Sequence, residues 1–269
     1  DDKDPAHPVL TNKHEPTVTQ VKVTKKWDDA NNQDGLRPKE IRVQLYAGDQ
    51  KLGKEVVLSA DNKWTHTFEK LAEKANGQAI HYSVKEVDVP EGYTVTEESK
   101  EKSDVVLTNT HTPSTVDIPV TKIWVDNDNQ DGLRPTKITV KLLANGGEVA
   151  RKDITSETDW KETFTGLPKF KDGKEIVYTL QEEKVENYSP SIDQESYTIT
   201  NTHTPGKTTL SVTKQWDDQE DKDGLRPKSV KVQLYADGKK SGEVIELSAE
   251  NKWTHTFADL DKNVKGKAV

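Results

Sequence analysis

The sequence contains no cysteine and no methionine among its 269 residues. Disulfide bonds, thiol chemistry, cysteine-ligated metals and iron–sulfur clusters are therefore excluded. It also lacks an apolar run of about 18 residues, the length that a membrane-spanning helix needs, so we expect no membrane insertion. No basic cluster is interleaved with aromatic residues, and the formal net charge is −8. Nucleic acid is therefore not expected as a partner.

Apolar residues are scarce, at 31% of the chain against 32% charged residues, a balance that indicates disorder unless the apolar residues are patterned. They are patterned in a repeat. TKKWDDANNQDGLRP begins at Thr24, TKIWVDNDNQDGLRP at Thr121 and TKQWDDQEDKDGLRP at Thr213. This spacing predicts a structural unit of about 95 residues.

Three later landmarks recur in the same order. They are the segments NKWTHTF, TDWKETF and NKWTHTF; IHYSVKE and IVYTLQE; and LTNTHTP and ITNTHTP. The third copy stops before its last two landmarks, and the early segment LTNKHEP is similar to a closing segment. We therefore expect a C-terminal remnant of a preceding repeat at 1–16, complete repeats at 17–113 and 114–205, and a truncated repeat at 206–269.

Short segments that alternate apolar and polar residues, separated by Asp-Gly, Asn-Gly, Gly and Pro, predict about seven half-buried strands per unit. No stretch has a sustained helical period. Units of this size fit two packed antiparallel sheets, which predicts an all-β chain of tandem β-sandwiches. The links around Pro113 and Pro205 are short, so we expect an elongated, semi-rigid array.

Polar side chains interrupt the apolar faces of these strands. Side chains of equal parity share a face, so Lys25 lies among Val21, Val23 and Trp27. By the same rule, a glutamate ends the apolar face of a later strand, and an asparagine lies on the apolar face of the closing strand. The interrupting residues are Lys25, Lys122 and Lys214; Glu86 and Glu182; and Asn109 and Asn201, with Asn12 in the opening remnant.

Burying an unpaired ammonium or carboxylate costs several kcal/mol, so these side chains must pair or become neutral. One interpretation is a buried, hydrogen-bonded ion pair that fixes strand register. The other is covalent. Full burial shifts a lysine pKa down and a glutamate pKa up by about 3 to 5 units, which gives a neutral amine and a neutral acid. The acid could polarise the asparagine carbonyl and pass a proton to departing ammonia, leaving a Lys–Asn isopeptide bond.

The order TKxWDD, DGxRP, W-x-x-x-F, Y-x-x-x-E and TNxxTP resembles the Cna B-type repeats of Gram-positive cell-wall-anchored surface adhesins and pilins, over nearly the whole chain. The resemblance implies an inverse immunoglobulin-like (prealbumin-like) sandwich and an intramolecular isopeptide bond formed without an enzyme. It also implies a stalk at the cell wall or cell surface of a Gram-positive bacterium. The matching residues are Lys25, Glu86 and Asn109 in one unit and Lys122, Glu182 and Asn201 in the next, with the glutamates catalytic and with Lys214 and Asn12 unpaired.

The sequence is compatible with two functions. In the first, self-locked repeats form a stalk that joins the remainder of a parent adhesin to the cell. In the alternative, the repeats bind host extracellular matrix directly, and the lysine, glutamate and asparagine form only a buried hydrogen-bonded cluster. Neither is an enzyme beyond one self-crosslinking turnover, and we expect no cofactor. The acidic loops at 28–35, 126–132 and 217–224 lack calcium-loop spacing, so we expect no metal there and interpret them as solvated turns.

Overall fold

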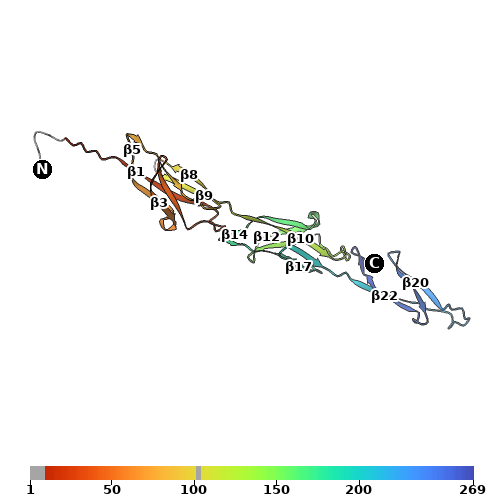
Figure 1. Cartoon of the computed structure of the whole chain (residues 1–269). Helices are drawn as coiled ribbons and strands as arrows, with labels where there is room; N and C mark the ends of the chain where they lie inside the picture. Colours follow the sequence, from red (N-terminus) through yellow and green to blue (C-terminus); the bar gives the residue numbers. More distant parts are fainter. Residues whose placement is uncertain (1–9, 101–103) are drawn as a thin grey trace. The chain divides into compact units, whose positions relative to one another are not determined.

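The computed structural model describes residues 10–100 and 104–269 (Figure 1). The chain divides into two compact units, Asp1–Val116 with Gly166–Ile176 and Asp117–Thr165 with Val177–Val269. Strands dominate both units, and short 3-10 turns occur at Ala60–Asn62 and Ser156–Thr158. No helix in the described ranges is long and apolar enough to cross a membrane. The predicted all-β class is confirmed.

The first complete repeat consists of two facing sheets. One sheet has the strand order β4-β1-β9-β8 and the other has the order β3-β2-β7. The strands are β1 (Val18–Asp28), β2 (Glu40–Ala47), β3 (Gln50–Ser59), β4 (Thr65–Ala72), β7 (Tyr82–Glu86), β8 (Thr94–Lys100) and β9 (Asp104–Thr110). A small hairpin of β5 (Lys74–Ala75) and β6 (Gln78–Ala79) lies between β4 and β7 in the chain.

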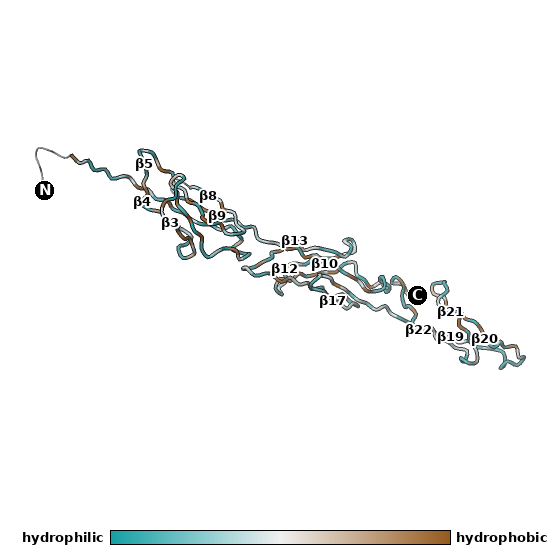
Figure 2. The backbone as a smooth tube through the Cα atoms, viewed as in Figure 1, coloured by the Kyte–Doolittle hydropathy of each residue, from teal (hydrophilic) through white to brown (hydrophobic). Residues whose placement is uncertain are grey.

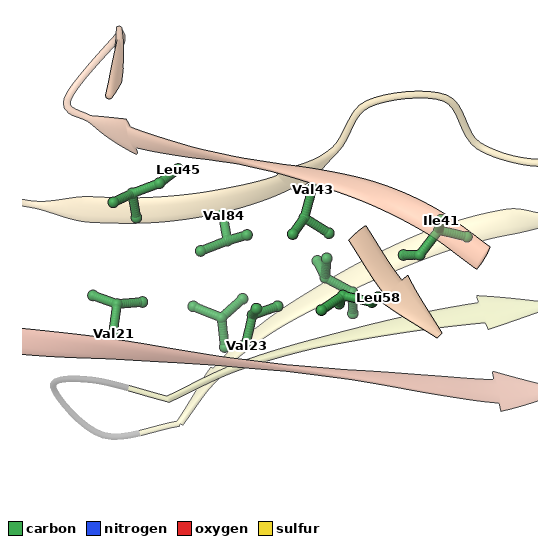
Figure 3. Close-up of a cluster of buried hydrophobic side chains, with 9 residues drawn as sticks. Val21, Val23, Ile41, Val43, Leu45, Leu58 and Val84 are labelled. Carbon is green, nitrogen blue, oxygen red and sulfur yellow. The ribbon is translucent and has the colours of Figure 1, made fainter. Parts of the chain in front are cut away.

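The core of this repeat lies between the two sheets (Figure 3). Alternate residues of β1 point inward, so Val21 and Val23 face Val43 and Val84 of the other sheet. Val23, Val43 and Val84 are fully buried. Each such side chain contributes roughly 1.5–3 kcal/mol when it is removed from water. The strand alternation in the sequence is thus explained by one buried face and one solvated face.

The second complete repeat has the same plan, with sheets of order β13-β10-β18-β17 and β12-β11-β16. Its strands are β10 (Thr115–Val125), β11 (Lys137–Ala144), β12 (Gly147–Thr155), β13 (Lys161–Pro168), β16 (Tyr178–Glu182), β17 (Ser189–Asp193) and β18 (Thr198–Thr202), with a hairpin of β14 (Phe170–Lys171) and β15 (Lys174–Glu175). Buried positions alternate with more exposed ones along β10 and β11, as they do in the first repeat. Figure 2 shows that hydrophobic and hydrophilic residues are interspersed along the chain.

Residues 206–269 form the counterparts of the first strands only. The pairs are β19 (Lys207–Thr213) with β22 (Thr254–Asp261), β20 (Ser229–Ala236) with β21 (Lys239–Ser248), and β23 (Asn263–Val264) with β24 (Lys267–Ala268). Leu247 is the one apolar side chain of this segment that is buried. This segment has no counterparts of β7, β8 and β9. The inner faces of its strands are therefore only partly covered by other strands.

The first and last strands of each complete repeat are parallel neighbours. Lys25 of β1 pairs with Leu107 of β9, and Trp27 pairs with Asn109. In the second repeat β10 pairs with β18 in the same way. Residues 10–17, which include the predicted closing segment, are in no strand, and residues 1–9 of the predicted remnant lie outside the described residues.

Candidate functional site

Three strands of the first repeat bring one lysine, one glutamate and one asparagine together. Lys25 extends inward from β1, Asn109 from the adjacent β9, and Glu86 from the end of β7 in the facing sheet. The side chains of Lys25 and Glu86 are 0% exposed, and Asn109 is likewise 0% exposed. All three therefore lie inside the sandwich, on the faces that strand parity predicts.

Glu86 connects the other two side chains. Asn109 Nδ2 donates a hydrogen bond of 3.0 Å to Glu86 Oε1. Lys25 Nζ lies 3.9 Å from Glu86 Oε2 and donates to the backbone carbonyl of Lys26 at 2.9 Å. No described residue hydrogen bonds to Glu86 Oε2 or Asn109 Oδ1. The carboxyl group thus lies between an amine and a carboxamide, in contact with both.

The second repeat has the same arrangement. Lys122 Nζ lies 3.2 Å from Glu182 Oε1, without the angles of a hydrogen bond. Asn201 Nδ2 donates to Glu182 Oε1 at 3.1 Å, and Asn201 is 0% exposed. The chain therefore contains two equivalent clusters, each enclosed in its own repeat.

Burial is the largest influence on the pKa values of Lys25, Lys122 and Glu86. It lowers the pKa of Lys25 to about 8, with partial opposition from the negative charges of Glu86 and Asp29. The pKa of Lys122 is also lowered to about 8 by burial, against the attraction of Glu182. Burial raises the pKa of Glu86, although the Asn109 hydrogen bond and Lys25 counteract it. A pKa near 8 leaves roughly a tenth of the amine neutral, and therefore nucleophilic, at neutral pH.

The carboxamide has a different orientation from the one expected. The sequence suggests a hydrogen bond from the glutamate to the asparagine oxygen, whereas the structure directs the asparagine nitrogen at Glu86. A carboxyl oxygen without a proton accepts hydrogen bonds, and Glu86 Oε1 accepts one from the amide N–H of Asn109. This orientation places the carboxyl group beside the nitrogen that would leave as ammonia.

Comparison with known proteins identifies the repeats. The sequence model of the Cna protein B-type domain matches residues 21–110, 118–202 and 210–269. The chain belongs to the Cna B-type domain family. A collagen adhesin of Staphylococcus aureus is 48% identical over 260 residues, which is 97% of this chain and 22% of that protein. The chain thus spans about a fifth of the length of that relative.

A crystal structure of two B repeat units of the collagen binding protein of Staphylococcus aureus is also similar. It has a TM-score of 0.66 and 47% identity, and the match covers 93% of this chain and 67% of that one. The predicted Cna B-type family and the fold of tandem inverse immunoglobulin-like sandwiches are confirmed.

Each complete Cna B-type repeat also contains a buried ion pair that sequence reasoning missed. Asp29 is 1% exposed and accepts bonds from Arg37 Nε at 3.0 Å and Nη2 at 2.5 Å. The Tyr93 hydroxyl donates to the same carboxylate at 2.8 Å. The loop predicted as a solvated turn is therefore partly buried, because Asp29 folds back onto the arginine of DGLRP. The recurrence of that arginine and of the aspartate in all three repeats was the available signal.

The second repeat forms the same ion pair between Asp126 and Arg134, at 3.0 and 2.6 Å, with Tyr188 donating at 2.8 Å. The Arg37 bonds lower the pKa of Asp29 to about 2, against the opposing effect of burial. Across residues 10–100 and 104–269, no cluster of three or more His, Asp or Glu side chains is arranged to hold a metal.

Lys214 and Asn12 are not brought to any comparable cluster. Lys214 Nζ donates to the Gln215 carbonyl at 2.9 Å, and its repeat lacks the strands that would carry the glutamate and asparagine. Asn12 is exposed on a segment outside the sheets. The histidines that follow the asparagines pair elsewhere: His111 lies 3.0 Å from Asp34, and His203 lies 3.0 Å from Asp131.

Proposed function

We propose that this chain is a stalk segment of a bacterial surface adhesin and that each complete repeat locks itself with one Lys–Asn isopeptide bond. The proposal rests chiefly on one observation. Two separate repeats each enclose a lysine, a glutamate and an asparagine within the same sandwich, with the carboxyl group in contact with both partners. In a noncovalent cluster the asparagine would serve only as a hydrogen-bond donor to the glutamate, whereas in the covalent lock it is the group that the lysine attacks.

The reaction balances without a cofactor. The neutral Nζ of Lys25 attacks Cγ of Asn109, a new C–N bond forms, and the bond from Cγ to Nδ2 breaks. Glu86 takes the proton from Nζ and gives a proton to Nδ2, which departs as ammonia. Lys122, Glu182 and Asn201 follow the same course. Each repeat reacts once, so the chain is not a catalyst for external substrates.

The bond would stabilise each repeat through loop closure. Joining Lys25 to Asn109 closes a loop of about 80 residues, and the chain-entropy model assigns such a cross-link about 4–5 kcal/mol. In a protein without cysteine, this cross-link would perform the function that disulfides perform in other exported domains.

The bond would also direct tension past the folded repeat. β1 and β9 are parallel neighbours and the first and last strands of the repeat, so a pulling force enters through one and leaves through the other. With Lys25 joined to Asn109, the covalent path crosses directly between the strands. The residues from 26 to 108 would carry no load, which is a useful property in a stalk.

The cellular context follows from the family and remains part of the proposal. We infer a position at the cell wall or cell surface of a Gram-positive bacterium, with the remainder of a parent adhesin as partner. We also propose that the functional units are 17–113 and 114–205, with a remnant at 1–16 and a partial repeat at 206–269.

A second candidate function is direct binding of host matrix, which the name of the collagen adhesin relative favours. Equivalent outward positions differ between repeats, however, as Lys22, Pro119 and Ser211 show. A binding surface that is reused in each repeat should keep such positions constant. The stalk is therefore the better supported function.

Peptide mapping separates these functions. The unfolded chain is digested and the fragments are sequenced by mass spectrometry. We expect branched peptides that join the segment around Lys25 to the segment around Asn109, and likewise Lys122 to Asn201. Linear peptides alone, together with saturable binding of the chain to immobilised collagen, would favour the matrix-binding function.

A further inference from the structure

In each repeat, one tryptophan contacts both the lysine and the arginine of the DGLRP motif. Lys25 Nζ lies 4.1 Å from the Trp27 ring centroid, and Arg37 Cζ lies 5.5 Å from it. In the second repeat, Lys122 Nζ and Arg134 Cζ lie 4.5 and 5.6 Å from the Trp124 ring centroid. In residues 206–269, Lys214 Nζ and Arg226 Cζ lie 4.2 and 5.7 Å from the Trp216 ring centroid. Electron-rich indole faces attract such cations, so the contact positions the lysine end group while it is charged, before the amine loses its proton and reacts.

The Trp27 ring is held on several sides. Trp64 and Tyr93 meet it edge to face, with centroids 5.3 and 5.1 Å away. Arg37 is fixed in turn by its two bonds to the buried Asp29. The indole Nε1 is buried and has no hydrogen-bond partner among the described residues. The ring is therefore oriented by contacts of its faces and edges, and its N–H group is not used.

Residues 206–269 show that this arrangement does not depend on the reactive cluster. Trp216 contacts Lys214 and meets Trp253 edge to face at 5.2 Å, and Arg226 bonds to Asp218 at 3.0 and 2.6 Å. This segment lacks the strands that would supply a glutamate and an asparagine. The first strand and the loop after it are thus sufficient to place the lysine against the ring.

The register connects the ring to the reacting atoms. Trp27 follows Lys25 by two residues on the same face of β1, and it is the Cα partner of Asn109 on β9. The ring therefore lies next to both the nucleophile and the carboxamide. An apolar wall at this place keeps water from the amine and restricts where the amine can move.

We propose that Trp27 and Trp124 are positioning residues of isopeptide formation, with the indole face holding the lysine amine against the carboxamide and the Asp–Arg ion pair fixing the ring. The proposal rests on the self-locking reaction proposed above. It assigns a function to the DGLRP motif, whose arginine bonds to Asp29 and lies over the Trp27 ring. Because misplacement of reacting groups by about 1 Å can cost about 100-fold in rate, loss of the ring face should be visible in the kinetics.

The test follows bond formation in newly made protein. The chain is synthesised in a cell-free system, synthesis is stopped, and the loss of ammonia from each repeat is followed by mass spectrometry of the unfolded chain and of its peptides. We expect Trp27→Leu to slow the loss from the first repeat by about 10-fold or more and Trp27→Phe, which keeps a ring face, to slow it by less than about 3-fold. The Lys122–Asn201 bond in the same molecule is the internal reference and should form at the parent rate.

A stability control separates positioning from packing. Both substitutions are repeated in a Glu86→Gln background, where no bond forms in the first repeat, and unfolding of that repeat is measured. Equal slowing by Phe and Leu, or rates that follow the unfolding midpoints, would overturn the proposal. If the parent itself loses no ammonia, the self-locking function fails instead, so the two failures are distinguishable.

If Trp27→Leu prevents folding, a second variant tests whether the ring positions the lysine. Asp29→Asn with Arg37→Met removes both charges of the ion pair at once and so leaves no unpaired buried charge. We expect the loosened ring to slow bond formation in the first repeat by about 3-fold or more, with the second repeat unchanged. Bond formation at the parent rate in this folded variant would contradict the proposed function of the ion pair.

Discussion

Trp27 and Asn109 are Cα partners in the parallel ladder between β1 and β9. Lys25 points to the same face two residues earlier and lies 3.9 Å from the glutamate that bonds to Asn109. A bond between the lysine and the asparagine would therefore join strands that are already neighbours, about 4.8 Å apart. Bond formation would need no rearrangement of the sheet, which suits a reaction that occurs as the repeat folds.

Replacing the glutamate should disable one repeat and spare the other. We expect Glu86→Gln to abolish the first bond, because the amide can neither accept the proton from Lys25 nor supply one to the leaving nitrogen. Unfolding of residues 17–113 should become easier by about 4–5 kcal/mol, the contribution of the lost loop closure. Pulse proteolysis in urea measures the free energy of unfolding of each repeat. Glu98→Gln on β8 is the matched control and should retain both bonds.

An unlinked repeat should become more stable as the pH rises above about 8. In Asn109→Ala the amine stays free, and burial holds the pKa of Lys25 at about 8 in the folded state, against 10.5 as its ordinary value. The folded state then binds fewer protons than the unfolded state between about pH 8 and pH 10.5. Its stability therefore rises through that window, by about 3 kcal/mol in total.

Urea unfolding of Asn109→Ala at several pH values across this window gives the measurement. The double variant Lys25→Met, Asn109→Ala has no amine at this position and should not show the rise. If the free energy of unfolding of Asn109→Ala stayed constant from pH 8 to pH 10, the lysine amine would be solvated in the folded repeat, contrary to the prediction.

The buried ion pair of the DGLRP motif should contribute strongly to stability. Arg37→Ala leaves Asp29, which is 1% exposed, as an uncompensated charge, and such losses cost about 3–5 kcal/mol. Arg42→Ala is the control, because Arg42 forms exposed pairs with Glu55 and Asp88 and should cost less than about 1 kcal/mol. Similar unfolding midpoints for the two variants would refute this prediction.

Pulling single molecules should distinguish locked from unlocked repeats. A parent repeat should not extend, since the load crosses from β1 to β9 through the bond. Lys25→Ala should show one unfolding event that releases about 320–350 Å of extended chain, from about 97 residues at 3.3–3.6 Å each. Atomic force microscopy measures the extension, and an event of that length in the parent would contradict the load path.

Strand parity in the sequence was sufficient to find both clusters. Lys25 and Asn109 interrupt apolar rows of period two, and the structure places them inside the sandwich because the same period governs burial. Their proximity could also be expected, since first and last strands that share a core tend to face the same interior. The orientation of the Asn109 carboxamide could not, because it depends on which protons Glu86 holds.

The Asp29–Arg37 ion pair had no such signal in the strand pattern. Ala30, Asn31 and Asn32 all adopt positive φ angles, between 49° and 62°, and this turn folds the chain back so that residues eight apart meet. Periodicity describes regular strands and says nothing about such a turn. The sequence did predict an unpaired Asn12, and the structure leaves Asn12 exposed on a segment outside the sheets.

Intact mass of the unfolded chain tests the central claim most directly. The parent is measured beside Lys25→Ala and Lys122→Ala under denaturing conditions, where noncovalent clusters no longer contribute. We predict a mass below the calculated value by two molecules of ammonia in the parent and by one in each variant. The full calculated mass for all three chains would contradict the self-locked stalk and leave Lys25, Glu86 and Asn109 as a noncovalent buried cluster.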